Sequence, residues 1–311
     1  MGFEVIATQI AMLGIAMLIG FLGVKLKYLG ADLRNAISSV IVKITLPLLI
    51  ITSITGQTLE RDMLKNAGLL IAIEILTIAL MIGLGLLTAK LFRLKNATRT
   101  IHTCMSAFGN VIFLGYPLIT ALYGAEGLFY AIIYALVNDS FVWTLCVYLM
   151  GKESGNRTKS PVKNLINPNT VSFVIAIPML CLGLKLPGLI HDALASVGSL
   201  TTYLSMLFIG MTLAVIDLRE IYKRFSIFVL SFVKMLLVPV FLIFVLGAVG
   251  LDKTLAGVLI LQVGMPVQTV LTILANEYQS DFKYATECVF ITTVLSLGTL
   301  PLVYHLILTF L

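Results

Sequence analysis

The sequence predicts an all-α polytopic membrane protein with ten transmembrane helices, arranged as two inverted five-helix repeats in which helices 4 and 9 are broken. Three observations predict this class. The chain of 311 residues is 59% hydrophobic and only 12% charged, whereas soluble proteins have about 25% charged residues. Apolar runs of about 20 residues, the length that spans a bilayer, recur throughout. Lysine and arginine gather in alternate connections between these runs.

The apolar runs give the individual spans. In the first repeat (residues 1–150) they predict helices at 4–24, 35–56, 66–91, 98–122 and 127–150. In the second repeat (165–311) they predict helices at 165–184, 192–215, 224–249, 254–276 and 284–310. The polar segment 151–164 is expected to be a cytoplasmic linker. The first run contains Glu4, and its basic residues Lys25 and Lys27 follow it, so we interpret it as a retained span and not a signal peptide.

The distribution of basic residues predicts the orientation. If the N-terminus lies outside, the inner connections hold fifteen lysines and arginines and the outer connections hold four. Both termini are therefore expected outside. Five spans per half make the second half start on the opposite side, which defines inverted repeats. A shift of 155 residues pairs Gly109 with Gly264 and Tyr123 with Tyr278, although chance recurrence of these residue types is an alternative.

Two spans contain helix-breaking residues at corresponding places. Proline lacks a backbone donor and clashes with the preceding turn, and broken helices in both halves are typical of a transporter's substrate site. Unwound backbone in a membrane is tolerated where it is buried or lines a cavity. The alternative is a pair of merely kinked helices. The candidate substrate-binding residues are Gly109, Asn110, Gly115, Pro117, Gly264, Met265, Pro266 and Gln268.

These residues favour a small organic anion as substrate. Half-helix N-termini carry a positive dipole end, and the carboxamides of Asn110 and Gln268 add donors. Every arginine lies in a predicted connection or within the first two residues of a predicted span. We therefore expect backbone N–H groups and amides, not a buried arginine, to hold a carboxylate.

Charged residues within spans are candidates for ion coupling. Asp139, preceded by Asn138, lies in the fifth span and is expected either to couple transport to H⁺ or Na⁺ or to be a structural hydrogen-bonding centre. Lys43, Glu74 and Lys234 are candidate support charges, with an ion pair between Glu74 and Lys234 as one arrangement and Lys43 reaching the cytoplasmic surface as another. Glu287, at the start of the tenth span, is expected to face the membrane surface.

Other function classes lack their motifs. No metalloprotease HExxH pattern, phosphate-binding glycine loop or Ser/His/Asp set occurs, so an enzyme is not expected. The four cysteines and three histidines show no metal-ligand spacing, so no metal and no cofactor other than a coupling ion is expected. The net charge of +6 is typical of inner connections in a membrane protein and does not indicate nucleic acid binding.

The motifs at the broken spans are distinctive. The first is Phe108-Gly109-Asn110 followed by Leu114-Gly115-Tyr116-Pro117-Leu118, and the second is Met265-Pro266-Val267-Gln268-Thr269 followed by Leu274-Ala275-Asn276-Glu277-Tyr278. In these motifs, and in span number and length, the chain resembles the auxin efflux carrier family. That family holds the plant PIN-FORMED carriers and many bacterial malate/malonate-type permeases.

The resemblance implies a mechanism. Spans 1, 2, 6 and 7 would form a scaffold that usually dimerises, and spans 3–5 and 8–10 a mobile transport domain working as an elevator. Spans 4 and 9 would cross at the substrate. Asn110 matches the family's crossover asparagine, whereas Met265 stands where the plant carriers have another asparagine. With the plant carriers' long central loop also missing, we expect a bacterial-type homodimer in the inner (plasma) membrane, transporting a small carboxylate.

Two alternatives remain open at this stage. A sodium-coupled bile-acid-type carrier or a cation/proton antiporter would share crossed broken helices, although Asp139 is a lone acid in the sequence and not part of a paired acidic motif. A membrane sensor could use the same fold to bind without transporting. The short loops and the lack of a signalling domain argue against it.

Overall fold

The computed structural model describes residues 2–56, 61–153, 168–215 and 224–311. Most of the predicted linker, residues 154–164, lies outside this part of the chain. Two compact units are present. Unit 1 comprises Met1–Gly68, Ile112–Ile132 and Ile166–Val215, and unit 2 comprises Leu69–Val111, Ile133–Leu165 and Ile216–Leu311.

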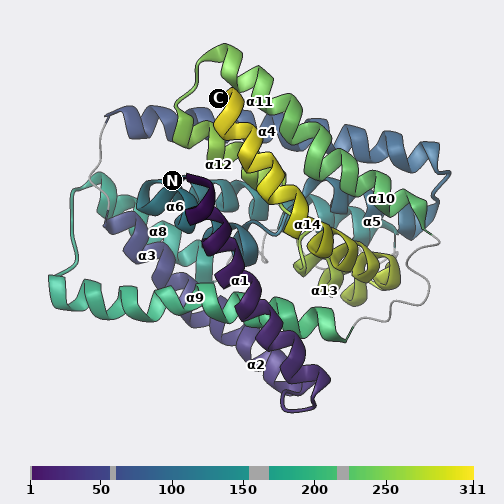
Figure 1. The fold of residues 1–311 in the computed structure, drawn as a ribbon, viewed down its shortest axis with the longest axis horizontal. Coiled ribbons are helices and arrows are strands. Elements are labelled where there is room, and N and C mark those ends of the chain that lie inside the picture. The colour runs from purple at the N-terminus through teal and green to yellow at the C-terminus, as the bar shows by residue number, and fades with distance from the viewer. Residues whose placement is uncertain (1, 57–60, 154–167, 216–223) are drawn as a thin grey trace. The chain divides into compact units, whose positions relative to one another are not determined.

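The described chain is helical, with π-helical turns (η) inside several long helices (Figure 1). In the first half the elements are α1 (Gly2–Lys25), α2 (Ala31–Val40), η1 (Ile41–Thr45), α3 (Leu46–Thr55), α4 (Arg61–Leu91), α5 (Asn96–Ala107), η2 (Val111–Gly115), α6 (Tyr116–Phe141), η3 (Val142–Cys146) and α7 (Val147–Glu153). In the second half they are α8 (Pro168–Cys181), α9 (Gly188–Ala214), α10 (Phe225–Phe232), η6 (Val233–Leu237), α11 (Val238–Val249), α12 (Lys253–Val263), α13 (Val270–Glu277) and α14 (Phe282–Phe310).

The all-α class is confirmed, because the described residues contain no strand and only one isolated bridge. Every predicted span overlaps at least one helix. Six helical stretches are long and apolar enough to cross a membrane: Asp32–Thr55, Lys65–Leu91, Val111–Glu153, Gly188–Ala214, Phe225–Val249 and Phe282–Phe310. The predicted fourth and ninth spans are interrupted, which shortens α5 and α12 to 12 and 11 residues. The count of ten and the inverted repeat stay predictions.

Local sequence explains the irregular points in the long helices. Pro47 and Pro239 are the second residues of α3 and α11, and each follows a π-helical turn, η1 or η6. Proline cannot donate to the preceding turn, and such turns absorb the lost hydrogen bond. Gly124 takes a left-handed φ of 63° inside α6. That angle suits glycine, and it divides α6 in the connection predicted between the fourth and fifth spans.

Unit 1 is held together by closely packed helices. α1 packs along α9, and α3 packs against both α8 and α9 (Figure 1). A Cβ atom at Gly20 would overlap the carbonyl oxygen of Leu207, and one at Gly210 would overlap that of Met17. Glycine at these two positions therefore sets how closely α1 and α9 approach.

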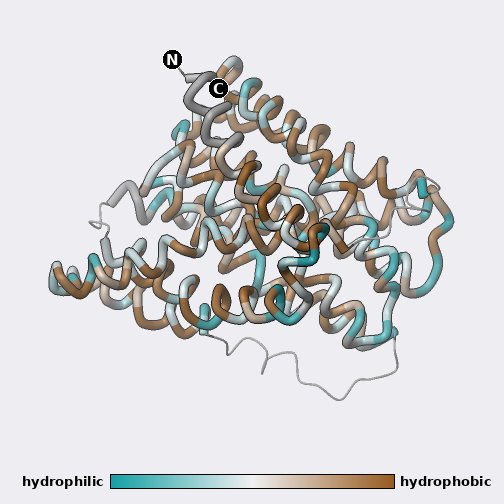
Figure 2. Tube along the Cα trace, turned by 60° about the horizontal axis from the view of Figure 1, so that its bottom comes forward, coloured by the Kyte–Doolittle hydropathy of each residue, from teal (hydrophilic) through white to brown (hydrophobic). Residues whose placement is uncertain are grey.

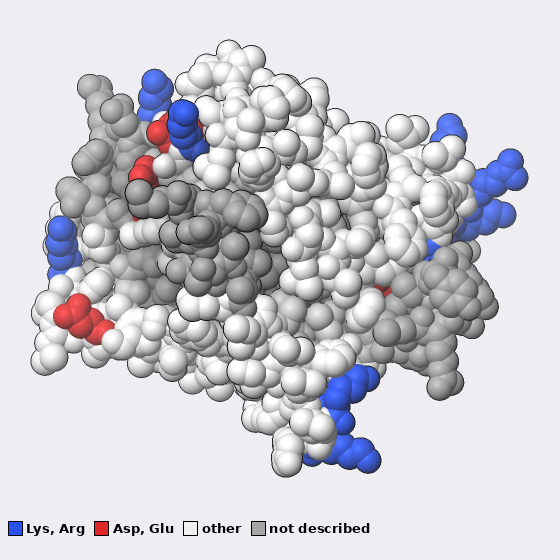
Figure 3. All heavy atoms as spheres, viewed as in Figure 1, with Lys and Arg blue, Asp and Glu red and all other residues white. Residues whose placement is uncertain are grey.

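Unit 2 is organised around α14, which contacts α5, α10, η6, α11, α12 and α13. α12 is buried throughout most of its length. Apolar residues dominate the helices (Figure 2). Many large apolar side chains are exposed, including those of Phe241 and Phe244 in α11. The face drawn in Figure 3 carries few charged side chains. An exposed apolar helix surface is what a lipid environment favours.

Candidate functional site

The two helix breaks predicted from the sequence lie side by side in unit 2. α5 ends at Ala107 and α12 ends at Val263, and the chain after each helix is extended or bent for a few residues. The Asn110 N–H donates to the Pro266 carbonyl oxygen at 2.7 Å, and the Gln268 N–H donates to the Phe108 carbonyl oxygen at 3.2 Å. These bonds flank an antiparallel bridge between Gly109 and Val267. Each unwound segment thus satisfies part of the other's backbone.

The contact between the breaks depends on small residues. A Cβ atom at Gly109 would lie 3.1 Å from the Met265 Cβ and 3.3 Å from the Gln262 carbonyl oxygen. A Cβ atom at Gly264 would lie 3.2 Å from the Pro239 Cγ. All three distances are shorter than ordinary van der Waals contact. Gly109 therefore permits the close approach of the two segments.

Backbone donors at the second break are already used. Its four N–H groups all donate within the protein: Gly264 to the Ile260 oxygen, Met265 to the Gln262 oxygen, Val267 to the Thr292 Oγ1 and Gln268 to the Phe108 oxygen. Within the described residues, the Gly109 N–H is the one amide of segments 108–110 and 264–268 that donates no hydrogen bond. Residues 264–268 therefore offer no N–H group to an anion, whereas the Thr269 and Val270 N–H groups at the start of α13 donate to no described residue. The expectation that backbone N–H groups of both breaks hold an anion stays a prediction.

The carboxamides of the two breaks differ in how they are engaged. Asn110 is 2% exposed, and its side chain forms no hydrogen bond with any described residue. Gln268 donates from Nε2 to the Asp139 Oδ1 at 3.0 Å and accepts from the Asn138 Nδ2 at 3.3 Å. The Asn138 amide also donates to the Asp139 Oδ1. Asn110 is thus available to a ligand, whereas Gln268 links the second break to the predicted coupling residues.

A second carboxyl group lies near this link. Glu74, on α4, is 0% exposed. Its carboxyl interacts electrostatically with Asp139 and lies close to the backbone of Asn138. Asp139 itself is half-buried. Glu74 and Asp139, which are 65 residues apart in the sequence, thus lie in the same unit of the structure.

The predicted pairing of Glu74 with Lys234 is wrong. Lys234, in η6, is 1% exposed and donates from Nζ to the Ser106 and Ala107 carbonyl oxygens at 3.4 and 3.5 Å. These carbonyls end α5, directly before the first break. Lys43, in η1 of unit 1, is exposed.

The proline in the first broken span does not mark the interruption. Segment 108–110 is the non-helical part, after which the helix resumes in η2 and α6. Gly115 ends η2, and Pro117 is the second residue of α6, in the first turn, where proline is tolerated. Both belong to unit 1, whereas Asn110 belongs to unit 2, so their place at the substrate site stays a prediction.

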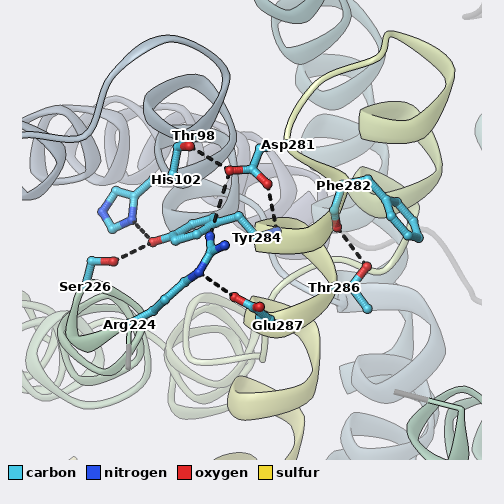
Figure 4. Close-up of polar contacts among 9 residues, drawn as sticks. All are labelled: Thr98, His102, Arg224, Ser226, Asp281, Phe282, Tyr284, Thr286 and Glu287. Atoms are coloured by element: carbon cyan, nitrogen blue, oxygen red, sulfur yellow. Dashed lines mark hydrogen bonds and ion pairs between the residues drawn. The ribbon is translucent and has the colours of Figure 1, made fainter. Parts of the chain in front are cut away.

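A polar cluster in unit 2 was missed by the sequence analysis (Figure 4). The His102 ring lies between the Thr88 Oγ1 at 2.8 Å and the Tyr284 hydroxyl at 2.7 Å. Arg224 lies 5.3 Å from the centre of the Tyr284 ring and pairs with Glu287 at 2.9 Å. The expectation that Glu287 faces the membrane surface is wrong, since it is 4% exposed.

The same cluster reaches the start of α14. Asp281 lies 3.8 Å from Arg224, accepts from the Thr98 hydroxyl at 2.6 Å, and caps α14 by accepting from the Tyr284 N–H at 3.0 Å. The cluster therefore joins α4, α5, α10 and α14. The signals that could have revealed it are a lone histidine inside a span and an N-cap aspartate before an apolar run.

Comparison with known proteins places the chain in a family. The family model described as "Membrane transport protein" matches residues 5–164 and 157–304. An uncharacterized transporter of Methanothermobacter thermautotrophicus is 26% identical over 294 residues, covering 93% of this chain and 94% of the relative. An uncharacterized transporter of Methanocaldococcus jannaschii is 24% identical with the same coverage. The chain thus belongs to the membrane transport protein family, the auxin efflux carrier family that its motifs resemble, whose members are transporters and not enzymes.

Proposed function

We propose that the protein is a secondary active transporter of small organic anions. The observation that carries this proposal is the pair of broken helices held side by side with the buried Asn110 carboxamide left without a hydrogen bond. A buried polar group without a partner is costly, and ligand binding removes that cost. The Gly109 N–H beside it is a second donor available to a carboxylate.

Coupling to H⁺ or Na⁺ would occur at Asp139. Its carboxylate accepts from Gln268, whose own backbone N–H holds the first break. A change in the charge of Asp139 would therefore alter its hydrogen bond with the Gln268 carboxamide. Through Gln268, it would also alter the hydrogen bonds between the paired segments. This chain of hydrogen bonds gives a physical route by which a cation could alter substrate affinity.

An elevator movement is the proposed transport step. Unit 2 contains both paired segments, Asn138, Asp139 and Lys234, whereas unit 1 contains α1, α3, α8 and α9. We propose that unit 2 moves as the transport domain relative to a unit 1 scaffold, which would dimerise in the plasma membrane with both termini outside. Each unit combines segments from both halves of the chain. This composition supports ten spans in inverted repeats whose broken helices cross.

Uptake by proteoliposomes tests the proposal. Purified protein would be reconstituted, and uptake of labelled malonate would be competed with acetate, malate, succinate and indole-3-acetate, each with and without a sodium or proton gradient. Neutral malonamide is the matched control for charge. We expect carboxylates to compete and malonamide to fail. Equal competition by malonamide would exclude the anion assignment, and binding of carboxylates without uptake would identify a sensor.

One observation favours a second candidate, a cation/proton antiporter. Glu74 and Asp139 lie close enough to interact electrostatically, so the paired acid that the sequence lacked is present in the structure. Two nearby carboxyls share protons unequally, which suits exchange of H⁺ for Na⁺. Sodium-driven proton movement in liposomes without any organic anion would favour this candidate over the first.

A further inference from the structure

Lys234 places a buried cation at the first helix break. Its side chain is among the largest fully buried ones in the described chain, with 1% of the residue exposed. Nζ lies 3.4 Å from the Ser106 oxygen and 3.5 Å from the Ala107 oxygen. Ala107 is the last residue of α5 and comes three residues before Asn110. The ammonium group therefore lies at the point where the first half-helix ends.

This cation has no acidic partner in the described part of the chain. Its Nζ donates to two neutral carbonyl groups, and the described ion pairs involve His191 and Arg224 instead. The helix C-terminus favours a cation, but only by about 0.3–1 kcal/mol in exposed settings and up to about 2 kcal/mol when partly buried. Removing an ammonium group from water costs several kcal/mol. Capping α5 alone does not balance that cost.

The break also lacks the positive groups that an anion needs. Residues 264–268 offer no free N–H, and the donors beside them, the Asn110 carboxamide and the N–H groups of Gly109, Thr269 and Val270, are all neutral. Neutral donors bind a carboxylate more weakly than charged donors do. A buried cation without a counter-charge and an anion site without a cation thus occur next to each other in unit 2.

We propose that Lys234 is the counter-charge of the transported anion and sets the preference of the site for anions over neutral analogues. This inference rests on the proposed function. In the empty protein the Ser106 and Ala107 carbonyls hold the ammonium group in place. The third N–H of the ammonium group is available to a substrate carboxylate at the break, alongside the Asn110 carboxamide.

Two variants test this role. Lys234→Met keeps the length and apolar stem and removes the charge, and Lys234→Arg keeps the charge. Lys90→Met, which removes an exposed lysine of unit 2, is the matched control. For Lys234→Met we expect the KM for labelled malonate to rise at least about tenfold, with malonamide now competing as well as malonate. Lys234→Arg should retain the preference for malonate, and Lys90→Met should behave as the wild type.

The outcomes separate this inference from the function on which it rests. If the wild-type protein takes up no carboxylate, the proposed function fails. If the wild type does so, and Lys234→Met retains both its KM and its preference for malonate, Lys234 only caps α5 and the inference is overturned. If Lys234→Met fails to fold, Lys234→Arg decides, because loss of the preference for malonate with the charge still present would also overturn it.

Discussion

At the scale of single residues, Asn110 is the clearest candidate for a ligand contact, because its carboxamide forms no hydrogen bond with any described residue. Its backbone N–H bond to Pro266 does not depend on the side chain. Asn110→Ala should therefore raise KM about 10- to 100-fold while the melting temperature changes little. Asn66→Ala is the control, since the Asn66 amide donates to the Tyr130 hydroxyl at 3.3 Å. That variant should lose some stability and keep KM. An unchanged KM in Asn110→Ala would make Asn110 structural.

Asp139 should determine the ion dependence. Asp139→Asn removes the charge but keeps an oxygen that can accept from the Gln268 Nε2, now 3.0 Å away. We expect uptake to lose its dependence on pH or sodium, while carboxylate binding is retained. Thermal stabilisation by malonate and uptake under imposed gradients would be measured together. Ion dependence equal to that of the wild type would leave Asp139 as a hydrogen-bonding residue only.

Residue types and motifs identified Asn110, Gln268 and Asp139, but not the contacts between them. Gln268 and Asp139 are 129 positions apart, and no local pattern encodes such a contact. Glu287 was misplaced for the same reason. A charge at the start of a span is usually solvated, and its partner Arg224 lies in a different connection, 63 residues earlier.

At the scale of elements, the paired breaks should depend on the lack of a side chain at Gly109. Gly109→Ala would bring a Cβ atom to 3.1 Å from the Met265 Cβ, so the segments must shift apart and lengthen their hydrogen bonds. We expect about 1–3 kcal/mol of destabilisation and a loss of uptake. Gly83→Ala, in α4 with no atom within 4 Å of the new Cβ, should be neutral or more stable. Equal effects of both changes would contradict this account.

The polar cluster around Arg224 should stabilise the packing of α10 against α14. Arg224→Met removes the cation that lies 2.9 Å from the buried Glu287 carboxylate, and removing one member of a buried ion pair is costly. We expect a loss of about 1–3 kcal/mol, smaller than for a fully buried pair because Arg224 is 31% exposed. Adding Glu287→Gln to Arg224→Met should recover part of the lost stability. A double-mutant cycle from thermal unfolding measures this coupling, and additive effects would argue against such stabilisation.

Hydropathy predicted the helices well because a segment that spans a membrane must satisfy its backbone hydrogen bonds internally, which an apolar segment does by forming a helix. Gly109 and Asn110, two of the candidate site residues, lie at the first interruption, whereas the proline of that span does not mark it. Pro117 fits the first turn of α6 without disrupting it, and the helix is broken at 108–110, where Gly109 allows the second segment to approach. The deciding interaction is tertiary, so a proline count could not find it.

At the scale of the whole molecule, each compact unit draws on both halves of the sequence. Unit 1 takes 1–68 and 112–132 from the first half and 166–215 from the second. Hydropathy divides the chain only into two consecutive halves, at the polar linker, and cannot show which helices pack together. That grouping follows from close contacts such as those at Gly20 and Gly210 between α1 and α9.

Orientation is the remaining prediction at this scale. The excess of lysine and arginine in alternate connections places Lys152 inside and Lys185 outside, since basic residues are retained on the cytoplasmic side. Both are exposed, so single cysteines there should react with a membrane-impermeant maleimide from opposite sides. Cys181 is exposed, whereas Cys104, Cys146 and Cys288 are buried, so Cys181→Ser gives a suitable background. Labelling of Lys152→Cys in intact cells, with Lys185→Cys protected, would show that the orientation is the opposite of the predicted one. Labelling of both from one side would instead require an even number of spans between them, which rules out the predicted single sixth span.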